Sequence, residues 1–247
     1  VLGSVAKERF NYSKAVGDFE KAIKLNPSFA TAHQWMGGLL LVMGDPEAAL
    51  TSYQKALSLD PRSRITGNNL ALTYYLLNRQ PEAVAVALEV FDFAPDFPEI
   101  SRSLMHLALS AGDCESVVRY GNRLAAILNK DVNATPVYND LCQTQDSEAR
   151  VKAVETILSW PSIEFSATGD ATLSYPEDIV LSLVDLGMFE PAVTLAEKHR
   201  DYYHHIILTR VRSMRSANGI NFYCDSRVQA LFEQTEIPPM DGKNICD

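Results

Sequence analysis

The sequence lacks a long hydrophobic run. Its apolar stretches, such as Leu39 to Met43 and Ile179 to Val184, are far shorter than the roughly 20 residues that a membrane-spanning helix needs. The first residues, Val1 to Phe10, also lack the basic start, apolar segment and small-residue cleavage site of a signal peptide. We therefore expect no membrane span in this fragment of a longer protein, and any anchor would lie upstream of Val1.

Positive charge is scarce as well. Lys and Arg number 22 against 31 Asp and Glu, which gives a formal net charge of −9 at pH 7. Nonspecific binding to DNA or RNA depends on basic surfaces that release counterions from phosphates, so this balance argues against nucleic acid as a direct ligand. With 47% hydrophobic and 21% charged residues, the chain has the composition of a folded globular protein.

The common catalytic signatures are missing. The sequence has no phosphate-binding glycine loop, no nucleophile elbow, no His-Glu-x-x-His and no Cys-x-x-Cys pair. His199, His204 and His205 form its histidine cluster, but their spacing, with Asp201 included, fits no common set of metal ligands. We predict a chain that is not an enzyme and needs no cofactor, with these histidines at the surface or in hydrogen bonds.

A fixed period is what the sequence does contain. Pro27, Pro61 and Pro95 are spaced by 34 residues, and each ends a helix-like stretch. Small and aromatic residues recur on the same frame. They are Gly3, Ala15, Phe19 and Ala22 in the first repeat, Gly37, Ala49, Tyr53 and Ala56 in the second, and Leu70, Ala71, Tyr74 and Ala83 in the third. Small residues let two helix backbones approach closely, while the large residue fills the gap to the next repeat.

This arrangement resembles the tetratricopeptide repeat, a pair of antiparallel helices. The resemblance implies an all-α, right-handed superhelical solenoid of about six helix pairs, of which the later ones are degenerate. We expect repeats 1 to 4 over residues 1–129, with the first truncated, degenerate helix pairs over 130–212, and a capping helix with a tail over 213–247. The three parts would form one continuous domain, with a loop over 161–174.

The inward positions of the first helices predict a concave groove. Its candidate peptide-binding residues are Gln34, Leu41, Asn68, Leu72, Tyr75, Arg102 and His106. This mixture of amide, aromatic, aliphatic and cationic side chains suits an extended or helical segment, so the expected partner is a protein or peptide. In an alternative interpretation, some of these side chains pack against the next repeat or against the C-terminal segment folded back into the groove.

A local basic run, formed by Arg210, Arg212 and Arg215, interrupts the acidic chain. Guanidinium groups bind carboxylates in a bidentate geometry, so an anion contact is one interpretation. We favour the other, a solvated face or internal ion pairs with the excess acidic residues.

Four cysteines allow three fully paired connectivities. We predict Cys224 with Cys246, because a thiol one residue from the end of a polar tail is hard to bury. We also predict Cys114 with Cys142, which regular stacking past Asn129 would bring together. In a reducing compartment, Cys114 and Cys142 would instead be small buried residues.

A second resemblance lies near the C-terminus. The segment from Cys224 to Pro239 is similar to the tail that closes the tetratricopeptide regions of bacterial membrane-bound winged-helix regulators of the ToxR or CadC type, and of some adenylate cyclases. In that tail an Asp-Pro-Arg-hydrophobic-Gln-Ala-Leu helix ends the array, and here Ser226 replaces the proline. The resemblance implies the sensory or docking region of a larger signalling or transcriptional regulator.

The same resemblance implies a periplasmic or extracytoplasmic location, which would favour disulfides. A cytoplasmic location is the alternative. A structural adaptor in an envelope or cytoplasmic assembly and the non-catalytic region of an adenylate cyclase are the competing functions. The identity of the partner and the oligomeric state are left open by the sequence.

Overall fold

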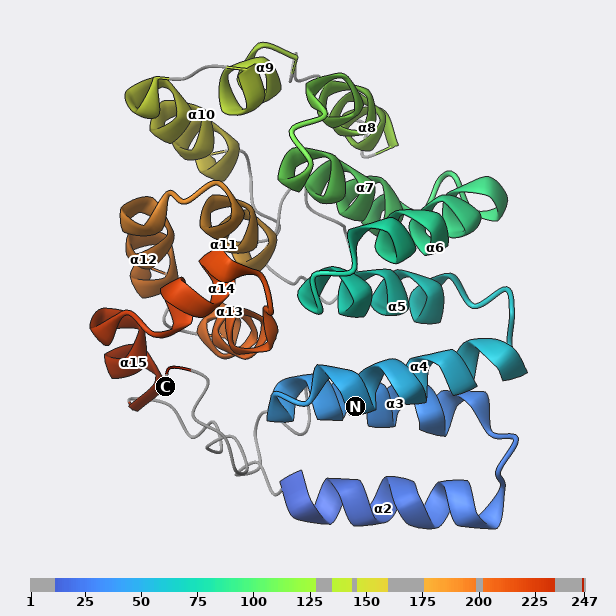
Figure 1. The fold of residues 1–247 in the computed structure, drawn as a ribbon. Coiled ribbons are helices and arrows are strands. Elements are labelled where there is room, and N and C mark those ends of the chain that lie inside the picture. The colour runs from blue at the N-terminus through green and yellow to red at the C-terminus, as the bar shows by residue number, and fades with distance from the viewer. Residues whose placement is uncertain are drawn as a thin grey trace.

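The computed structural model describes residues 12–127, 135–143, 146–159, 176–198, 202–233 and 246. These residues form helices and their connections, without a β-strand in the described ranges (Figure 1). The helices are α2 (Tyr12–Leu25), α3 (Ala30–Met43), α4 (Pro46–Leu59), α5 (Arg64–Leu76), α6 (Gln80–Phe93), α7 (Pro98–Ser110), α8 (Cys114–Ile127), α9 (Thr135–Gln143), α10 (Ser147–Ser159), α11 (Pro176–Asp185), α12 (Phe189–Lys198), α13 (Tyr202–Ser213), α14 (Ala217–Tyr223) and α15 (Ser226–Glu233).

Consecutive helices pack as antiparallel pairs. The pairs are α3 with α4, α5 with α6, α7 with α8, α9 with α10, and α11 with α12. The second helix of one pair also packs on the first helix of the next, as α4 does on α5, α6 on α7 and α8 on α9. This stacking of helix pairs confirms the tetratricopeptide-type superhelical solenoid predicted from the 34-residue period.

The turn between the two helices has the same backbone conformation in four of the pairs. Gly44, Asn78 and Gly112 are spaced by 34 residues and have positive φ values of 82°, 58° and 70°, and Gly187 follows with 72°. Glycine and asparagine tolerate this left-handed conformation better than other residues, and it ends a helix while pairing its last carbonyls. The turn after α3 is followed by Asp45, whose Oδ1 accepts a hydrogen bond from the Ala48 amide at 3.0 Å and caps α4.

Small residues sit where the helices of a pair cross. Ala49 and Ala83 are completely buried. A Cβ atom placed on Gly37 would lie 3.0 Å from the Tyr53 ring, and one on Gly67 would lie 2.4 Å from Val90 Cγ2. Glycine at these two positions therefore allows an approach that a larger residue would prevent.

The array returns toward its beginning after α10. Helix α11 packs on α12, α13 and α14, and also on α7. Helix α13 packs on α3, so Figure 1 shows the chain curving round until residues past 200 lie beside the second repeat. The first helices of the early pairs thus face the C-terminal helices of the same chain.

The segment predicted over residues 213–247 as a capping helix with a tail contains α15, which packs on α12 and α14. Helix α14 was not expected, and the predicted loop over 161–174 lies outside the described residues. Among the described residues, every helix falls short of the length and hydrophobicity that crossing a bilayer requires.

Candidate functional site

Two of the inward side chains, Gln34 and Asn68, join neighbouring repeats. Thr66 Oγ1 donates to Gln34 Oε1 at 3.2 Å, which links α5 to α3. Ser103 Oγ donates to Asn68 Oδ1 at 2.8 Å, which links α7 to α5. Arg102 is only 3% exposed. For Gln34 and Asn68, packing against the next repeat is therefore the arrangement that the structure shows.

Further along the same inner face, Tyr75 and His106 contact α11. The Tyr75 hydroxyl donates to Asp185 Oδ2 at 2.5 Å, and His106 Nδ1 lies 2.5 Å from Ser182 Oγ. Both contacts join residues of the early repeats to a helix that begins at Pro176. The predicted groove is thus filled at these two positions by the chain's own C-terminal half.

Asp185 is the centre of this contact. Its Oδ2 also accepts from Ser110 Oγ at 2.5 Å, and its Oδ1 from Ser216 Oγ at 3.4 Å. The Asn218 side-chain amide donates to its backbone carbonyl at 2.9 Å. One carboxylate therefore ties α5, α7 and α11 to the segment that starts α14, with several donors sharing the charge.

The basic run docks on the ends of two helices. Arg212 Nη2 donates to the Val42 carbonyl at 2.6 Å, and the Arg215 amide donates to the Leu76 carbonyl at 2.7 Å. These carbonyls belong to the last turns of α3 and α5, where a helix lacks internal partners and is electronegative. Arg212 is 2% exposed, so the interpretation of this residue as part of a solvated face is wrong.

The turn at Gly44 leaves room for the Arg212 side chain. A Cβ atom on Gly44 would lie 2.7 Å from Arg212 Nε. Nearby, Ser213 Oγ donates to the Leu41 carbonyl at 3.4 Å. Leu41 itself is half-buried and packs against the core cluster. The end of α13 therefore packs closely against the last turn of α3 and the glycine that follows it.

The space left between the early repeats and α11 is small. Leu72, Tyr75, His106 and Leu181 contribute to the lining of a cavity of about 30 Å³. Such a volume holds roughly one or two water molecules. A peptide would therefore have to displace α11 to reach Leu72 or Tyr75.

Ser182 and His106 have the spacing of a nucleophile and its base, but not the access. A hydroxyl within hydrogen-bond reach of an imidazole is the first requirement of a nucleophilic serine. Ser182 is 5% exposed and faces α7 from α11. A substrate cannot reach this hydroxyl while the two helices are packed, so the pair holds α11 in place.

The histidine cluster of the sequence was the candidate for a metal site. Within the described ranges, no group of three or more His, Cys, Asp or Glu side chains is arranged to hold a metal ion. The side chains of His204 and His205, and all of His199, lie outside the described residues.

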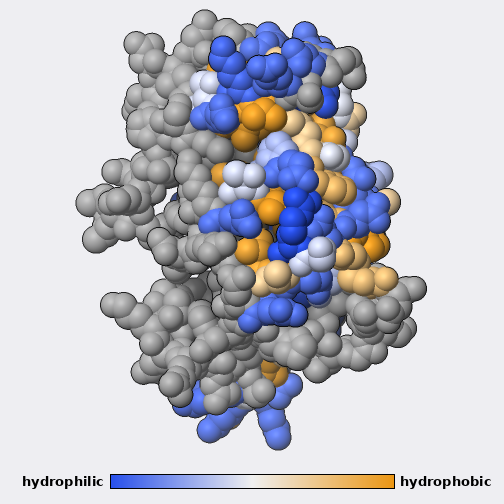
Figure 2. Space-filling model, turned by 90° about the vertical axis from the view of Figure 1, so that its left-hand side faces the viewer, coloured by the Kyte–Doolittle hydropathy of each residue, from blue (hydrophilic) through white to orange (hydrophobic). Residues whose placement is uncertain are grey.

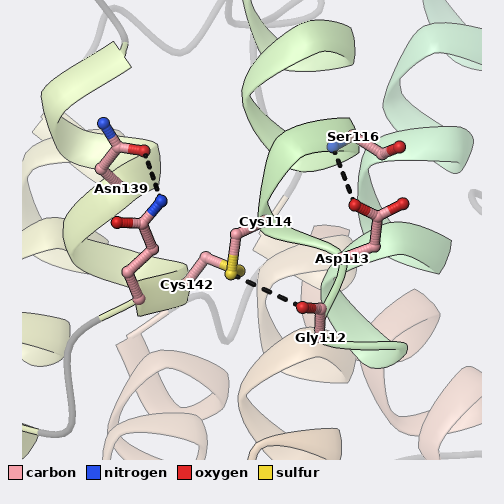
Figure 3. Close-up of a disulfide and its surroundings, with 7 residues drawn as sticks. Gly112, Asp113, Cys114, Ser116, Asn139 and Cys142 are labelled. Atoms are coloured by element: carbon pink, nitrogen blue, oxygen red, sulfur yellow. Dashed lines mark hydrogen bonds between the residues drawn. A yellow bond between two sulfur atoms is a disulfide. The ribbon is translucent and has the colours of Figure 1, made fainter.

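Two disulfides join the four cysteines. Cys114, the first residue of α8, is bonded to Cys142 near the end of α9, with Cα atoms 5.5 Å apart (Figure 3). Cys224, which follows α14, is bonded to Cys246, again with Cα atoms 5.5 Å apart. These are the same two pairs as those expected from the sequence, and no cysteine of the chain is free.

A groove on the outer side of the molecule was not predicted. Helices α10 and α12 line a space of about 390 Å³, with Val151 and Val154 on one wall and Pro191 and Leu195 on the other. Glu155 and Glu190 also line it. Figure 2 views the molecule from the side of α10, α12 and α15 and shows apolar side chains between polar ones on this face. The sequence signal was the fading of the repeat pattern in this region.

Comparison with known proteins agrees with the geometry. Residues 30–63 match the tetratricopeptide repeat family. Over 87 residues the chain is 30% identical to anaphase-promoting complex subunit 7 of Dictyostelium discoideum. The matched stretch covers 35% of this chain and 15% of that protein. Over 50 residues it is 40% identical to the Hsp70-Hsp90 organizing protein of Triticum aestivum. This match covers 20% of this chain and 9% of that protein.

A solved structure extends the similarity to the fold. The crystal structure of yeast Tom70 aligns with a TM-score of 0.50 and 14% sequence identity, over 94% of this chain and 48% of that chain. The chain spans 15% and 9% of the two curated relatives and about half of this solved chain. Together these findings identify a tetratricopeptide repeat at residues 30–63 and show that the fold is shared with the solved structure.

Proposed function

We propose that this chain binds a partner protein through surfaces outside its concave face, as the sensory or docking region of a larger regulator. One observation carries the proposal: α11 and α13 occupy the concave side of α3, α5 and α7 through side-chain and backbone contacts. An extended peptide recognised in that groove would compete with half-buried hydrogen bonds to Asp185 and to the Val42 carbonyl. On the outer helices, Thr51 of α4 and Glu89 of α6 are exposed in the part of the chain that the structure describes.

The relatives support the scaffold part of this proposal. One is named as a subunit of the anaphase-promoting complex, and the other as an Hsp70-Hsp90 organizing protein. Each matched stretch is a small part of the relative, so the similarity concerns the repeat and not the whole activity of either protein. The common use of such repeats is protein binding, and we infer the same for this chain.

The disulfides support a location outside the cytoplasm, in the periplasm or an equivalent oxidising compartment. All four cysteines are paired. Disulfides persist in oxidising compartments and are rare where thiols are kept reduced. Non-reducing peptide mapping of the protein from its native source tests this: a free Cys246 thiol would contradict the location, and both bonds intact would support it.

The experiment for partner binding is site-specific photo-crosslinking in the full-length protein. A photoreactive residue at Leu72 on the inner face should yield only links within the chain. The same residue at exposed outer positions, Thr51 on α4, Glu89 on α6 and Thr194 on α12, should yield a link to another protein from at least one of them. Links to another protein from Leu72 alone would return the site to the concave face, and none from any position would contradict the scaffold function.

The regulator part is tested by the sequence upstream of Val1. A winged-helix pattern followed by one apolar span would support the sensory or docking region of a membrane-bound regulator. A cyclase domain would support the cyclase alternative instead, and a plain signal peptide the structural adaptor.

A further inference from the structure

The groove between α10 and α12 lies where the stacking of helix pairs changes. Helix α10 packs on α9, whereas α11 packs on α12, α13, α14 and α7. In the earlier repeats, each second helix receives the first helix of the following pair along its side. At α10 the wall formed by Val151 and Val154 faces a space of about 390 Å³ across from α12. This volume is within the range of about 300 to 1,000 Å³ that ligand sites have.

The walls of the groove are apolar, and acidic residues border them. Val151 and Pro191 are half-buried, Val154 and Leu195 behind them are buried, and Thr194 and Glu155 are exposed. The side chain of Glu190 is 77% exposed although it accepts from Arg227 Nη1 at 2.8 Å. Half-buried apolar walls with an exposed polar border are typical of surfaces that bind another protein.

The acidic border extends along both helices. Glu148 lies seven residues before Glu155 on α10, and Glu197 seven residues after Glu190 on α12, so each pair shares one face of its helix. The bases beside them in the described structure are Arg150 and Lys152 on α10 and Arg227 of α15, which is paired with Asp225 as well as Glu190. With Asp225 included, five carboxylates against these three cations leave the border negative.

From this geometry we propose that the groove between α10 and α12 binds an amphipathic helix of a partner protein that carries basic residues beside its apolar face. Apolar side chains at the i, i+3 and i+4 positions of such a helix would fill the space between the valines of α10 and Leu195 of α12. Lysine or arginine residues on its flanks would lie near the glutamates. A positively charged partner helix is therefore favoured over a negatively charged one. This inference rests on the proposed function and adds the surface and the partner's chemistry.

The test uses a labelled helical peptide of about 15 to 20 residues, with leucines on one face and lysines elsewhere, long enough to form a helix when bound. A second peptide has every lysine replaced by glutamate. Fluorescence anisotropy at physiological salt, where charges more than about 8 Å apart are largely screened, measures binding to the whole chain with its disulfides intact. The lysine peptide should bind saturably, and the glutamate peptide should not.

Two matched variants locate the binding. Thr194 and Thr51 are both exposed helix residues whose hydroxyls donate to the carbonyl four residues earlier, at 3.0 and 3.2 Å. Thr194→Trp puts a large ring at the groove wall and should weaken binding of the lysine peptide at least about tenfold, whereas Thr51→Trp on α4 should change it less than about twofold. Glu155→Lys should weaken binding more than Glu89→Lys, which reverses an exposed charge on α6.

Three outcomes would overturn the proposal. They are equal effects of Thr194→Trp and Thr51→Trp, equal binding of the two peptides, and no saturable binding of the lysine peptide. The native partner can also be crosslinked from a photoreactive residue at Glu89, with and without the Thr194→Trp substitution. Equal crosslinking of the two proteins would support partner binding by the chain but would show that the partner does not bind in the groove between α10 and α12. Circular dichroism of each variant checks that the helices are retained.

Discussion

The early repeats and the returning C-terminal helices are held together in different ways. In α3 to α8, small buried residues such as Ala49 and Ala83 recur at a fixed period, and each helix packs on its neighbours in sequence. In α11 to α15, the decisive bonds span the chain: Tyr75 to Asp185 joins residues 110 apart, and Arg212 to Val42 joins residues 170 apart. The first arrangement is local and apolar, and the second is long-range and polar.

This difference changes how the two regions should unfold. A linear solenoid has stability that is roughly a sum of repeat and neighbour terms, so its ends fray independently. Contacts of α13 with α3 and of α11 with α7 connect the late part to the early part. The C-terminal helices should therefore lose their structure first when a long-range contact is removed, while the early repeats remain folded.

The largest expected effect is loss of the disulfide that links α8, the last helix of the early repeats, to α9. Replacing Cys114 and Cys142 together by serine removes a bond that closes a chain segment with a sequence separation of 28. In the chain-entropy model this should lower the free energy of unfolding by about 3 kcal/mol. Urea denaturation followed by circular dichroism measures the change. A loss no larger than the error of the method would show that regular stacking alone joins α8 to α9.

Next in size is Arg212→Leu, which breaks the contact of α13 with α3. The Val42 carbonyl would lose a charged donor inside the protein, and a cost of about 2 to 3 kcal/mol is expected. Limited proteolysis should cut within α13 to α15 before it cuts the early repeats. Arg62→Leu, at an exposed arginine of the turn after α4, is the control and should leave the cleavage pattern unchanged.

The regular stack is tested by Ala49→Leu. Ala49 has no exposed surface at its helix crossing, so added methyl groups should overpack the second repeat at a cost of roughly 1 to 3 kcal/mol. The same change at Ala85, which is exposed on α6, should have little effect. Equal melting temperatures of wild type and Ala49→Leu would mean that the crossing is looser than the structure indicates.

A smaller effect is expected from a pair of neighbouring tyrosines. Tyr75→Phe removes the hydroxyl that donates to Asp185, and Tyr74→Phe removes the one that accepts from the Gln54 amide at 2.8 Å. Each should cost about 1 kcal/mol, as one hydrogen bond does. Only Tyr75→Phe should speed hydrogen exchange in α11 and α14. Faster exchange there in both variants would contradict the separation between the two regions.

The smallest effect concerns the capping helix. The Arg227 side chain donates to Asp225 and lowers the pKa of that carboxyl to about 2. Because the pKa is lower in the folded state, ionised Asp225 stabilises the fold above about pH 4, and this contribution is lost as the pH falls through 2. Asp225→Asn should lower the melting temperature slightly at pH 7 and not at pH 2. The ion pair is near the surface, so solvent screening keeps the difference small.

The fold could be predicted because its signal repeats. Pro27, Pro61 and Pro95 mark the ends of successive pairs, and the limits of α3 to α8 follow from them. The inward positions were also identifiable, since they recur at the same period. That the C-terminal segment folds back into the groove was an alternative in the sequence analysis. Its contacts could not be predicted, because Tyr75 and His106 meet Asp185 and Ser182 of α11, and the sequence around these partners carries no repeat.

The sequence alone determined the helix pairs, the small residues at their crossings and the turns with positive φ, because these depend on neighbours one repeat away. The tertiary structure decided the rest. Only the path of the whole chain brings Arg212 to the last turn of α3 and the Asp185 carboxylate to Tyr75. Such contacts depend on the accumulated rotation of many stacked pairs, which no single repeat encodes, and that rotation also left the space between α10 and α12.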